Sequence, residues 1–104
     1  MTIQGEMGNG ILTVKPEGKL DTVSSPELEA YLKERYDGCR QIVIDLEKVD
    51  YISSAGLRVL VQAHKVMKDR EGLVLRHVCG RVMEVLEMTG YVHVLRIEEN
   101  TEEM

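Results

Sequence analysis

Residues 49–57, VDYISSAGL, decide the fold because they join a buried strand to a long helix. Before them, residues 41–46 (QIVIDL) are almost continuously apolar and β-branched, which predicts a strand buried on both faces of a parallel sheet. After them, apolar residues recur at the i, i+3, i+4, i+7 spacing of a helix over residues 54–69. The predicted inward face comprises Leu57, Leu60, Val61, His64 and Met67. The predicted outward face comprises Arg58, Gln62, Lys65 and Lys68.

The remaining elements follow from turn and cap signals. Gly8, Asn9 and Gly10 predict a hairpin turn between the first two strands. Ser25 is the predicted N-cap of a first helix that starts at Pro26. That helix stops at residues 37–38 (DG), and a short helix lies between Gly80 and Gly90. The predicted strands are residues 2–7, 11–15, 41–46, 73–78 and 92–97.

The order of these elements is β-β-α-β-α-β-α-β, which predicts an α/β fold. Strands that alternate with helices are joined by right-handed crossovers, so the sheet should be mostly parallel, with an N-terminal hairpin. Functional sites in such sheets gather where the carboxyl ends of strands meet the amino ends of helices. The VDYISSAGL junction occupies such a place.

Composition narrows the class of protein. The 104 residues suffice for a single domain over residues 1–104, and the absence of Trp and Phe predicts an aliphatic core. A net charge of −5 argues against direct nucleic-acid binding, which needs a basic surface. No apolar run approaches the roughly 20 residues of a membrane span, and the first residues do not resemble a signal peptide. Residues 98–104, with four Glu, are predicted to form a mobile acidic tail.

Cysteines and standard motifs point to no cofactor or metal. Cys39 and Cys79 lack paired metal-ligand spacing, so we expect two reduced, mostly buried thiols in a cytoplasmic protein. The chain also lacks the phosphate-binding G-x-x-x-x-G-K-[ST] and the zinc-binding H-E-x-x-H patterns.

Two hydroxyls stand where the long helix begins. Either Ser53 or Ser54 can cap the first turn, while Ala55 and Gly56 allow close packing. The same geometry suits a phosphoryl acceptor, because a phosphate there would meet free N–H groups and the positive end of the helix dipole. Phosphorylation would add about −1.5 to −2 charges at one point of the surface. Gly56 would also leave room for the active site of a kinase.

Asp21 follows the second strand and has two interpretations. It would lie near Ser54 if the two strands are neighbours. It could equally form an Asx-type turn that leads into the first helix.

An enzymatic alternative starts from the same strand–Ser–turn–helix layout. A hydrolase nucleophile elbow reads G-x-S-x-G, whereas the residue two before Ser54 is Ile52. The general base would have to be His64, His77 or His93. A chain of this length leaves little room for a loop-lined substrate pocket, so a binding module is favoured over an enzyme, and no catalytic residue is assigned.

The chain resembles a STAS domain, specifically a bacterial anti-sigma factor antagonist. The resemblance rests on residues 18–21 (GKLD), 42–46 (IVIDL), 49–57 (VDYISSAGL) and 83–90 (MEVLEMTG). It spans nearly the whole chain. It implies a four- to five-stranded sheet with helices packed mainly on one face and a role in partner switching.

The resemblance also implies partners. In partner switching, the antagonist binds an anti-sigma factor that is a serine kinase, and the sigma factor is released. The kinase then uses ATP to phosphorylate the antagonist, and a PP2C-type phosphatase reverses the reaction. ATP belongs to the kinase, so no cofactor is expected here.

The same resemblance assigns residues. The acceptor of the family falls on Ser54, and Ser53 is the alternative because it stands where the family often has Asp. Asp21 matches an acidic position of the family. The implied partner-binding residues are Asp21, Ser53, Ser54, Ala55, Gly56, Leu57 and Arg58. A STAS module that binds or senses a partner without being phosphorylated remains the alternative function.

Overall fold

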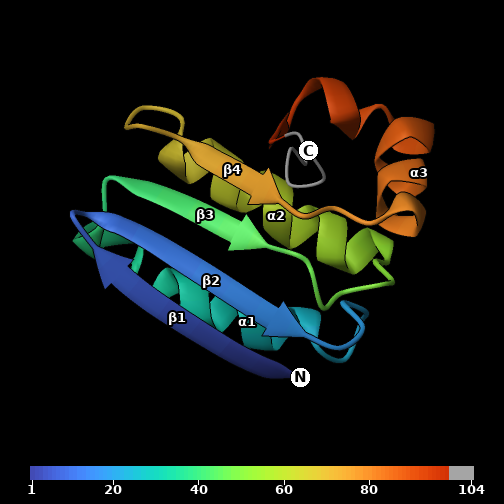
Figure 1. Ribbon diagram of the computed structural model, residues 1–104, viewed down its shortest axis with the longest axis horizontal. Coiled ribbons are helices and arrows are strands. Elements are labelled where there is room, and N and C mark those ends of the chain that lie inside the picture. Colours follow the sequence, from blue (N-terminus) through green and yellow to red (C-terminus); the bar gives the residue numbers. More distant parts are fainter. Residues whose placement is uncertain (99–104) are drawn as a thin grey trace, which may run out of the picture.

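The computed structural model describes residues 1–98, which form a five-stranded sheet and three α-helices (Figure 1). The strands lie in the spatial order β1-β2-β3-β4-β5. They are β1 (Thr2–Gly8), β2 (Ile11–Glu17), β3 (Gln41–Asp45), β4 (Leu73–Arg76) and β5 (Arg96–Ile97). The helices are α1 (Ser25–Lys33), α2 (Ser54–Met67) and α3 (Gly80–Thr89), with short 3-10 turns at Tyr36–Gly38 and Tyr91–His93.

The predicted hairpin and parallel sheet are confirmed. β1 pairs antiparallel with β2, and the turn residues Asn9 and Gly10 have φ of 55° and 80°, as tight hairpin turns require. The pairs β2–β3, β3–β4 and β4–β5 are parallel. β2 runs two residues further than predicted, because it stays paired with β1 as far as Glu17. Pro16 is tolerated within β2 because the ladder between β2 and β3 ends at Val14.

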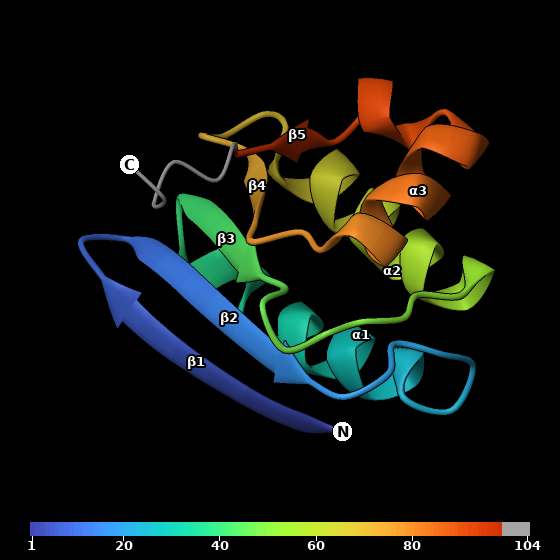
Figure 2. The same ribbon diagram turned by 45° about the vertical axis from the view of Figure 1, so that its right-hand side comes forward.

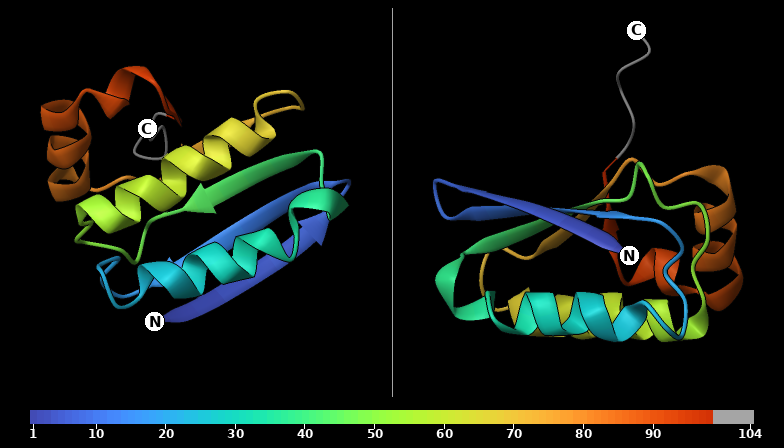
Figure 3. Two further views of the ribbon diagram at one scale, coloured as in Figure 1. Left: turned by 180° about the vertical axis from the view of Figure 1, so that it is seen from behind. Right: turned by 90° about the horizontal axis from the view of Figure 1, so that it is seen from below.

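The helices lie mainly on one side of the sheet, as the resemblance implied (Figure 3). α1 and α2 run side by side beneath the strands, and α3 stands beyond the carboxyl end of β4 (Figure 2). The core between the layers is aliphatic, as predicted from the composition. Its fully buried members include Val14, Leu28, Ile44, Leu60, Met67, Leu75 and Leu86. Burying each such side chain contributes roughly 1.5–3 kcal/mol.

The buried stripe of α2 differs slightly from the prediction. Leu57, Leu60 and Met67 are buried, but Val61 and His64 are only half-buried. Val59 is buried instead, because it lies on the side that faces α1.

The ends of α1 are corrected by the structure. Ser25 is the first helical residue, not the cap, and Ser24 precedes it. The helix ends at Lys33, before the predicted stop at residues 37–38. After Lys33 the chain tightens into 3-10 turns, in which the Arg35 N–H donates to the Leu32 carbonyl and the Gly38 N–H donates to the Arg35 carbonyl.

Three strands are shorter than predicted, β3 by one residue, β4 by two and β5 by four. β4 stops at Arg76 because His77 adopts a left-handed φ of 57°. Only Arg96 and Ile97 pair with β4, since the preceding 3-10 turn carries residues 91–93 away from it. Glu98, the first residue of the predicted tail, donates its N–H to the Leu75 carbonyl at 2.8 Å. The rest of the predicted tail, residues 99–104, lies outside the described residues. Within residues 1–98, no helix is both long and apolar enough to cross a bilayer.

Candidate functional site

The loop after β2 and the segment before α2 are joined by a short parallel bridge. Leu20 and Ile52 pair across it, with Leu20 N donating to the Tyr51 carbonyl at 3.0 Å and Ser53 N donating to the Leu20 carbonyl at 2.9 Å. This pairing places Asp21 next to the serines at the start of α2. The expectation that these two segments are neighbours is therefore confirmed.

The two serines have different roles in the helix start. Ser53 is the N-cap: its backbone is extended, and its hydroxyl accepts a hydrogen bond from the Gly56 N–H at 3.4 Å. Ser54 is the first helical residue and is exposed. Within residues 1–98 its hydroxyl takes part in no hydrogen bond. The hydroxyl that is available for chemistry is thus that of Ser54.

Asp21 combines both of its predicted roles. Its carboxylate accepts hydrogen bonds from the backbone N–H groups of Ser24 and Val23, each at 3.0 Å, and so closes an Asx-type turn. The hydrogen bond from Ser24 is the main reason why the pKa of this carboxyl lies below its ordinary value. Asp21 is therefore a fixed negative charge beside the serines.

Gly56 is buried and lets the helix approach the bridge closely. A β-carbon at this position would come within 2.8 Å of the Leu20 carbonyl oxygen and 2.9 Å of Ile52 Cγ1. The prediction that Gly56 makes room for a kinase is wrong, because its α-carbon faces the core and not solvent. The prediction of close packing is confirmed.

Two grooves flank the first half of α2. One, of about 420 Å³, runs between α1 and α2 and includes Ala55. The other, of about 310 Å³, runs between α2 and the Thr89–Tyr91 region and includes Ser54 and Leu57. Arg58 is exposed and lines both grooves. Of the predicted partner-binding residues, Ser54, Ala55, Leu57 and Arg58 thus line the two grooves, whereas Gly56 is buried.

Three neighbours of this region were not predicted from the sequence. Val23 is 81% exposed and Tyr51 is 47% exposed, which is unusual for large apolar side chains. The Lys19 ammonium lies 5.5 Å from the centroid of the Tyr51 ring. The signal in the sequence was their place within or beside the GKLD and VDYISSAGL motifs.

The hydrolase alternative finds no support in the geometry. Within residues 1–98, neither Ser53 nor Ser54 is hydrogen-bonded to a histidine. His77 Nδ1 lies instead 3.0 Å from Asp45 Oδ1, where β3 and β4 end.

A family model of the STAS domain matches residues 3–104. The chain belongs to the STAS domain family. The anti-sigma-B factor antagonist of Staphylococcus aureus is 38% identical to this STAS domain over 92 residues, which are 86% of this chain and 84% of the relative. BtrV of Bordetella bronchiseptica is 35% identical over 96 residues, which are 90% of this chain and 83% of BtrV.

Solved structures confirm the fold of this STAS domain. A crystal structure of an anti-sigma factor antagonist from Mycobacterium paratuberculosis has a TM-score of 0.86 at 22% identity, covering 98% of this chain and 88% of that one. The anti-sigma factor antagonist SpoIIAA in its unphosphorylated form has a TM-score of 0.74 at 16% identity, covering 98% and 92%. SpoIIAA has also been solved in its phosphorylated form, with a TM-score of 0.75 at 17% identity, covering 98% and 94%.

Proposed function

We propose that the chain is a cytoplasmic anti-sigma factor antagonist, with residues 1–104 forming one STAS domain. It binds an anti-sigma factor serine kinase, releases a sigma factor, and is switched off when the kinase phosphorylates Ser54. A PP2C-type phosphatase restores it. The curated relatives and the STAS fold support the class of function. The observation that carries the site is the exposed hydroxyl of Ser54 at the amino end of α2.

Ser54 is a better acceptor than Ser53. The Ser53 hydroxyl is engaged with the Gly56 N–H, and Ser53 is only partly exposed. A kinase would have to break the helix cap to use it, at a cost of about 1 kcal/mol. Phosphorylation of Ser54 would leave the helix cap at Ser53 intact.

The surroundings of Ser54 can hold a phosphate without refolding. The backbone N–H groups of Ser54 and Ala55 begin α2, where helical hydrogen-bond partners are missing and the dipole is positive. Arg58 follows Ser54 by four residues, which places both on one face of the helix. These N–H groups and Arg58 would therefore balance the negative charge of a phosphate on Ser54.

The switch then acts on the partner and not on the fold. A dianion in a packed interface must be desolvated, and it would be repelled by acidic groups of the partner. Asp21 already supplies one fixed negative charge beside the serines. A hundredfold loss of affinity needs only about 2.7 kcal/mol, which a single phosphate can provide.

The proposed docking surface is centred on Ser54 and extends along the two grooves beside α2. Val23 and Tyr51 add exposed apolar area at its edge. Aromatic and arginine side chains are the residues that most often dominate protein interfaces. We therefore expect Tyr51 and Arg58 to contribute more to kinase binding than their polar neighbours.

The test is to incubate the protein, Ser54→Ala and Ser53→Ala with purified anti-sigma factor serine kinases and ATP, and to measure intact mass. The expected result is a gain of one phosphoryl group that is lost only in Ser54→Ala. Binding to the same kinase is measured in parallel with Tyr51→Ala and Arg58→Ala. Gln4→Ala is the matched control, because Gln4 is exposed on β1, outside the two grooves beside α2.

Two other outcomes would change the conclusion. Kinase binding without any phosphorylation would favour a constitutive STAS binding module. The serines would then serve only to begin and cap α2. Large changes in backbone amide shifts far from Ser54 after phosphorylation would contradict a switch that acts by local electrostatics.

A further inference from the structure

Three potential metal ligands meet at the carboxyl end of the sheet, away from the serines. Asp45 is the last residue of β3, Glu47 follows two residues later, and His77 comes directly after β4. β3 and β4 are parallel neighbours with Asp45 opposite Arg76, so these side chains emerge at the same edge. One donor atom of each residue lies within 4.8 Å of the others.

The Asp45 carboxylate is buried. The residue is only 7% exposed, whereas Glu47 is exposed. Its Oδ1 atom accepts a hydrogen bond from the Glu47 N–H at 3.0 Å and lies 3.0 Å from His77 Nδ1. Both contacts that the carboxylate makes among residues 1–98 go to Oδ1. Oδ1 is therefore the carboxylate oxygen that faces both the Glu47 backbone and the imidazole.

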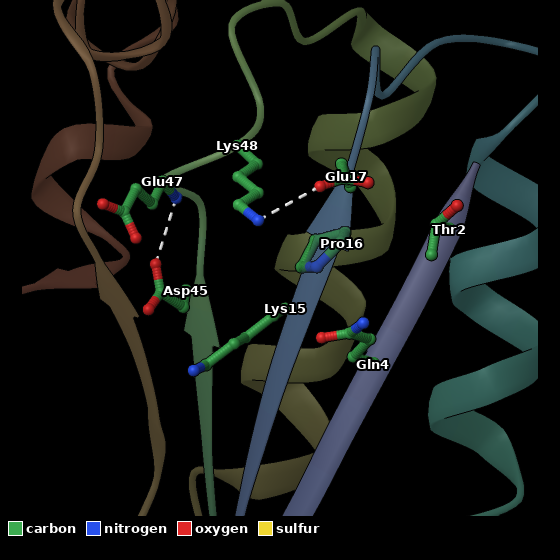
Figure 4. Close-up of a pocket in the computed structure, with 8 residues that line it drawn as sticks. All are labelled: Thr2, Gln4, Lys15, Pro16, Glu17, Asp45, Glu47 and Lys48. Atoms are coloured by element: carbon green, nitrogen blue, oxygen red, sulfur yellow. Dashed lines mark hydrogen bonds and ion pairs between the residues drawn. The ribbon is translucent and has the colours of Figure 1, made fainter.

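The cluster borders a hollow on the face of the sheet opposite the helices. This hollow of about 180 Å³ is lined by Asp45 and Glu47 together with residues of β1 and β2 (Figure 4). It is wide enough for several water molecules, each of which occupies about 30 Å³ in the liquid. A cation bound by the cluster would thus have space on one side for water or a small anionic ligand.

We propose that Asp45, Glu47 and His77 bind a divalent first-row transition-metal ion such as Zn²⁺ or Co²⁺. One imidazole and two carboxylates form a nitrogen–oxygen donor set that suits these ions. Bonds of about 2.0–2.2 Å to such ions place neighbouring ligand atoms roughly 3–3.5 Å apart. The 3.0 Å between His77 Nδ1 and Asp45 Oδ1 already meets this condition. Rotation of the exposed Glu47 side chain would bring its carboxylate oxygen from within 4.8 Å of the other two ligand atoms to the same spacing.

Charge and protons balance in this arrangement. The ion takes the place of any proton on the ligating imidazole nitrogen, and that proton passes to solvent. Two carboxylates offset the double positive charge. Nearby cations have other partners, since Lys48 pairs with Glu17 at 3.3 Å and Arg76 pairs with Glu98 at 2.8 Å. Lys15 also lines the hollow and could compete for Asp45 (Figure 4).

The test is a titration of the full chain with Co²⁺, followed by visible absorption and by displacement with Zn²⁺ in a calorimeter. The variants are Glu47→Gln and His77→Asn, because Glu47 is exposed and Asn tolerates the left-handed backbone of residue 77. His93→Asn is the matched control, since His93 is exposed on the turn after α3. Thermal melting of each variant verifies that it is folded.

The expected result is one Co²⁺ per chain, with binding at least tenfold weaker in Glu47→Gln and in His77→Asn but unchanged in His93→Asn. Absence of Co²⁺ or Zn²⁺ binding at submillimolar concentration would overturn the proposal. Binding that survives both cluster variants would overturn it as well, since the ion would then lie elsewhere. None of these outcomes depends on Ser54, so the proposed switch is tested separately.

Discussion

Replacing Gly56 by Ala tests whether the serine junction is held by close packing. In a helix interior, Ala is favoured over Gly by about 1 kcal/mol, so an uncrowded site would become more stable. At Gly56 the new β-carbon would lie 2.8 Å from Leu20 Cγ, 2.8 Å from the Leu20 carbonyl oxygen and 2.9 Å from Ile52 Cγ1. Overpacking costs about 1–3 kcal/mol, and the upper end applies because one of these atoms is backbone.

The balance predicts that Gly56→Ala lowers the free energy of unfolding by about 1–2 kcal/mol. Urea denaturation at equilibrium measures it, with the midpoint moving to lower urea and the slope unchanged. Part of the clash can be relieved by moving α2 away from the Leu20–Ile52 bridge. We therefore also expect altered amide shifts at Asp21 and Ser53, the residues adjoining that bridge.

Gly80→Ala is the matched control. Gly80 is the first residue of α3, is exposed, and has no heavy atom within 4 Å of the position of a β-carbon. This variant should be as stable as the parent or slightly more stable. If Gly56→Ala matched or exceeded Gly80→Ala in stability, the close contact between α2 and the bridge could not be what fixes the junction.

Three further predictions concern single side chains. Ser53→Ala should lose about 1 kcal/mol of unfolding free energy with the helix cap, whereas Ser54→Ala should change it by less than about 0.5 kcal/mol in urea denaturation. Burial raises the pKa of Tyr36 to about 12, so its stabilising contribution is present below pH 10 and is lost as pH rises towards 12. Ultraviolet titration of tyrosinate should therefore lose its most alkaline step in Tyr36→Phe, and a step that persists would contradict this assignment. Hydrogen bonds lower the pKa of Asp21, so its contribution is present above the unfolded-state pKa and fades as pH falls through the lowered value. Acid denaturation of Asp21→Ala should show a smaller pH dependence than the parent, and an unchanged dependence would count against the turn.

Much of the fold could be predicted from periodicity and turn chemistry. The QIVIDL strand, the hairpin around Asn9 and the start of α2 are encoded in consecutive residues, and each was predicted correctly. The errors lie at the ends of elements. α1 gives way to 3-10 turns after Lys33, and the left-handed backbone of His77 ends β4. The residue types at these two ends do not reveal either change of backbone conformation.

The candidate site shows the same division. The sequence alone determined that two hydroxyls begin a helix after a buried strand, and that Asp21 follows an earlier strand. Only the tertiary structure decided that Ser53 is the cap and Ser54 the exposed hydroxyl, because the cap depends on how α2 meets the Leu20–Ile52 bridge.

The cluster of Asp45, Glu47 and His77 could not be predicted from the sequence. His77 lies 32 residues after Asp45, and no standard metal motif has that spacing. The parallel pairing of β3 with β4 brings these residues to one edge. Patterns along the chain determine which elements form and which face is buried, because they depend on neighbours in sequence. Which polar groups meet depends on strand order and register, and these are set by the packing of the whole domain.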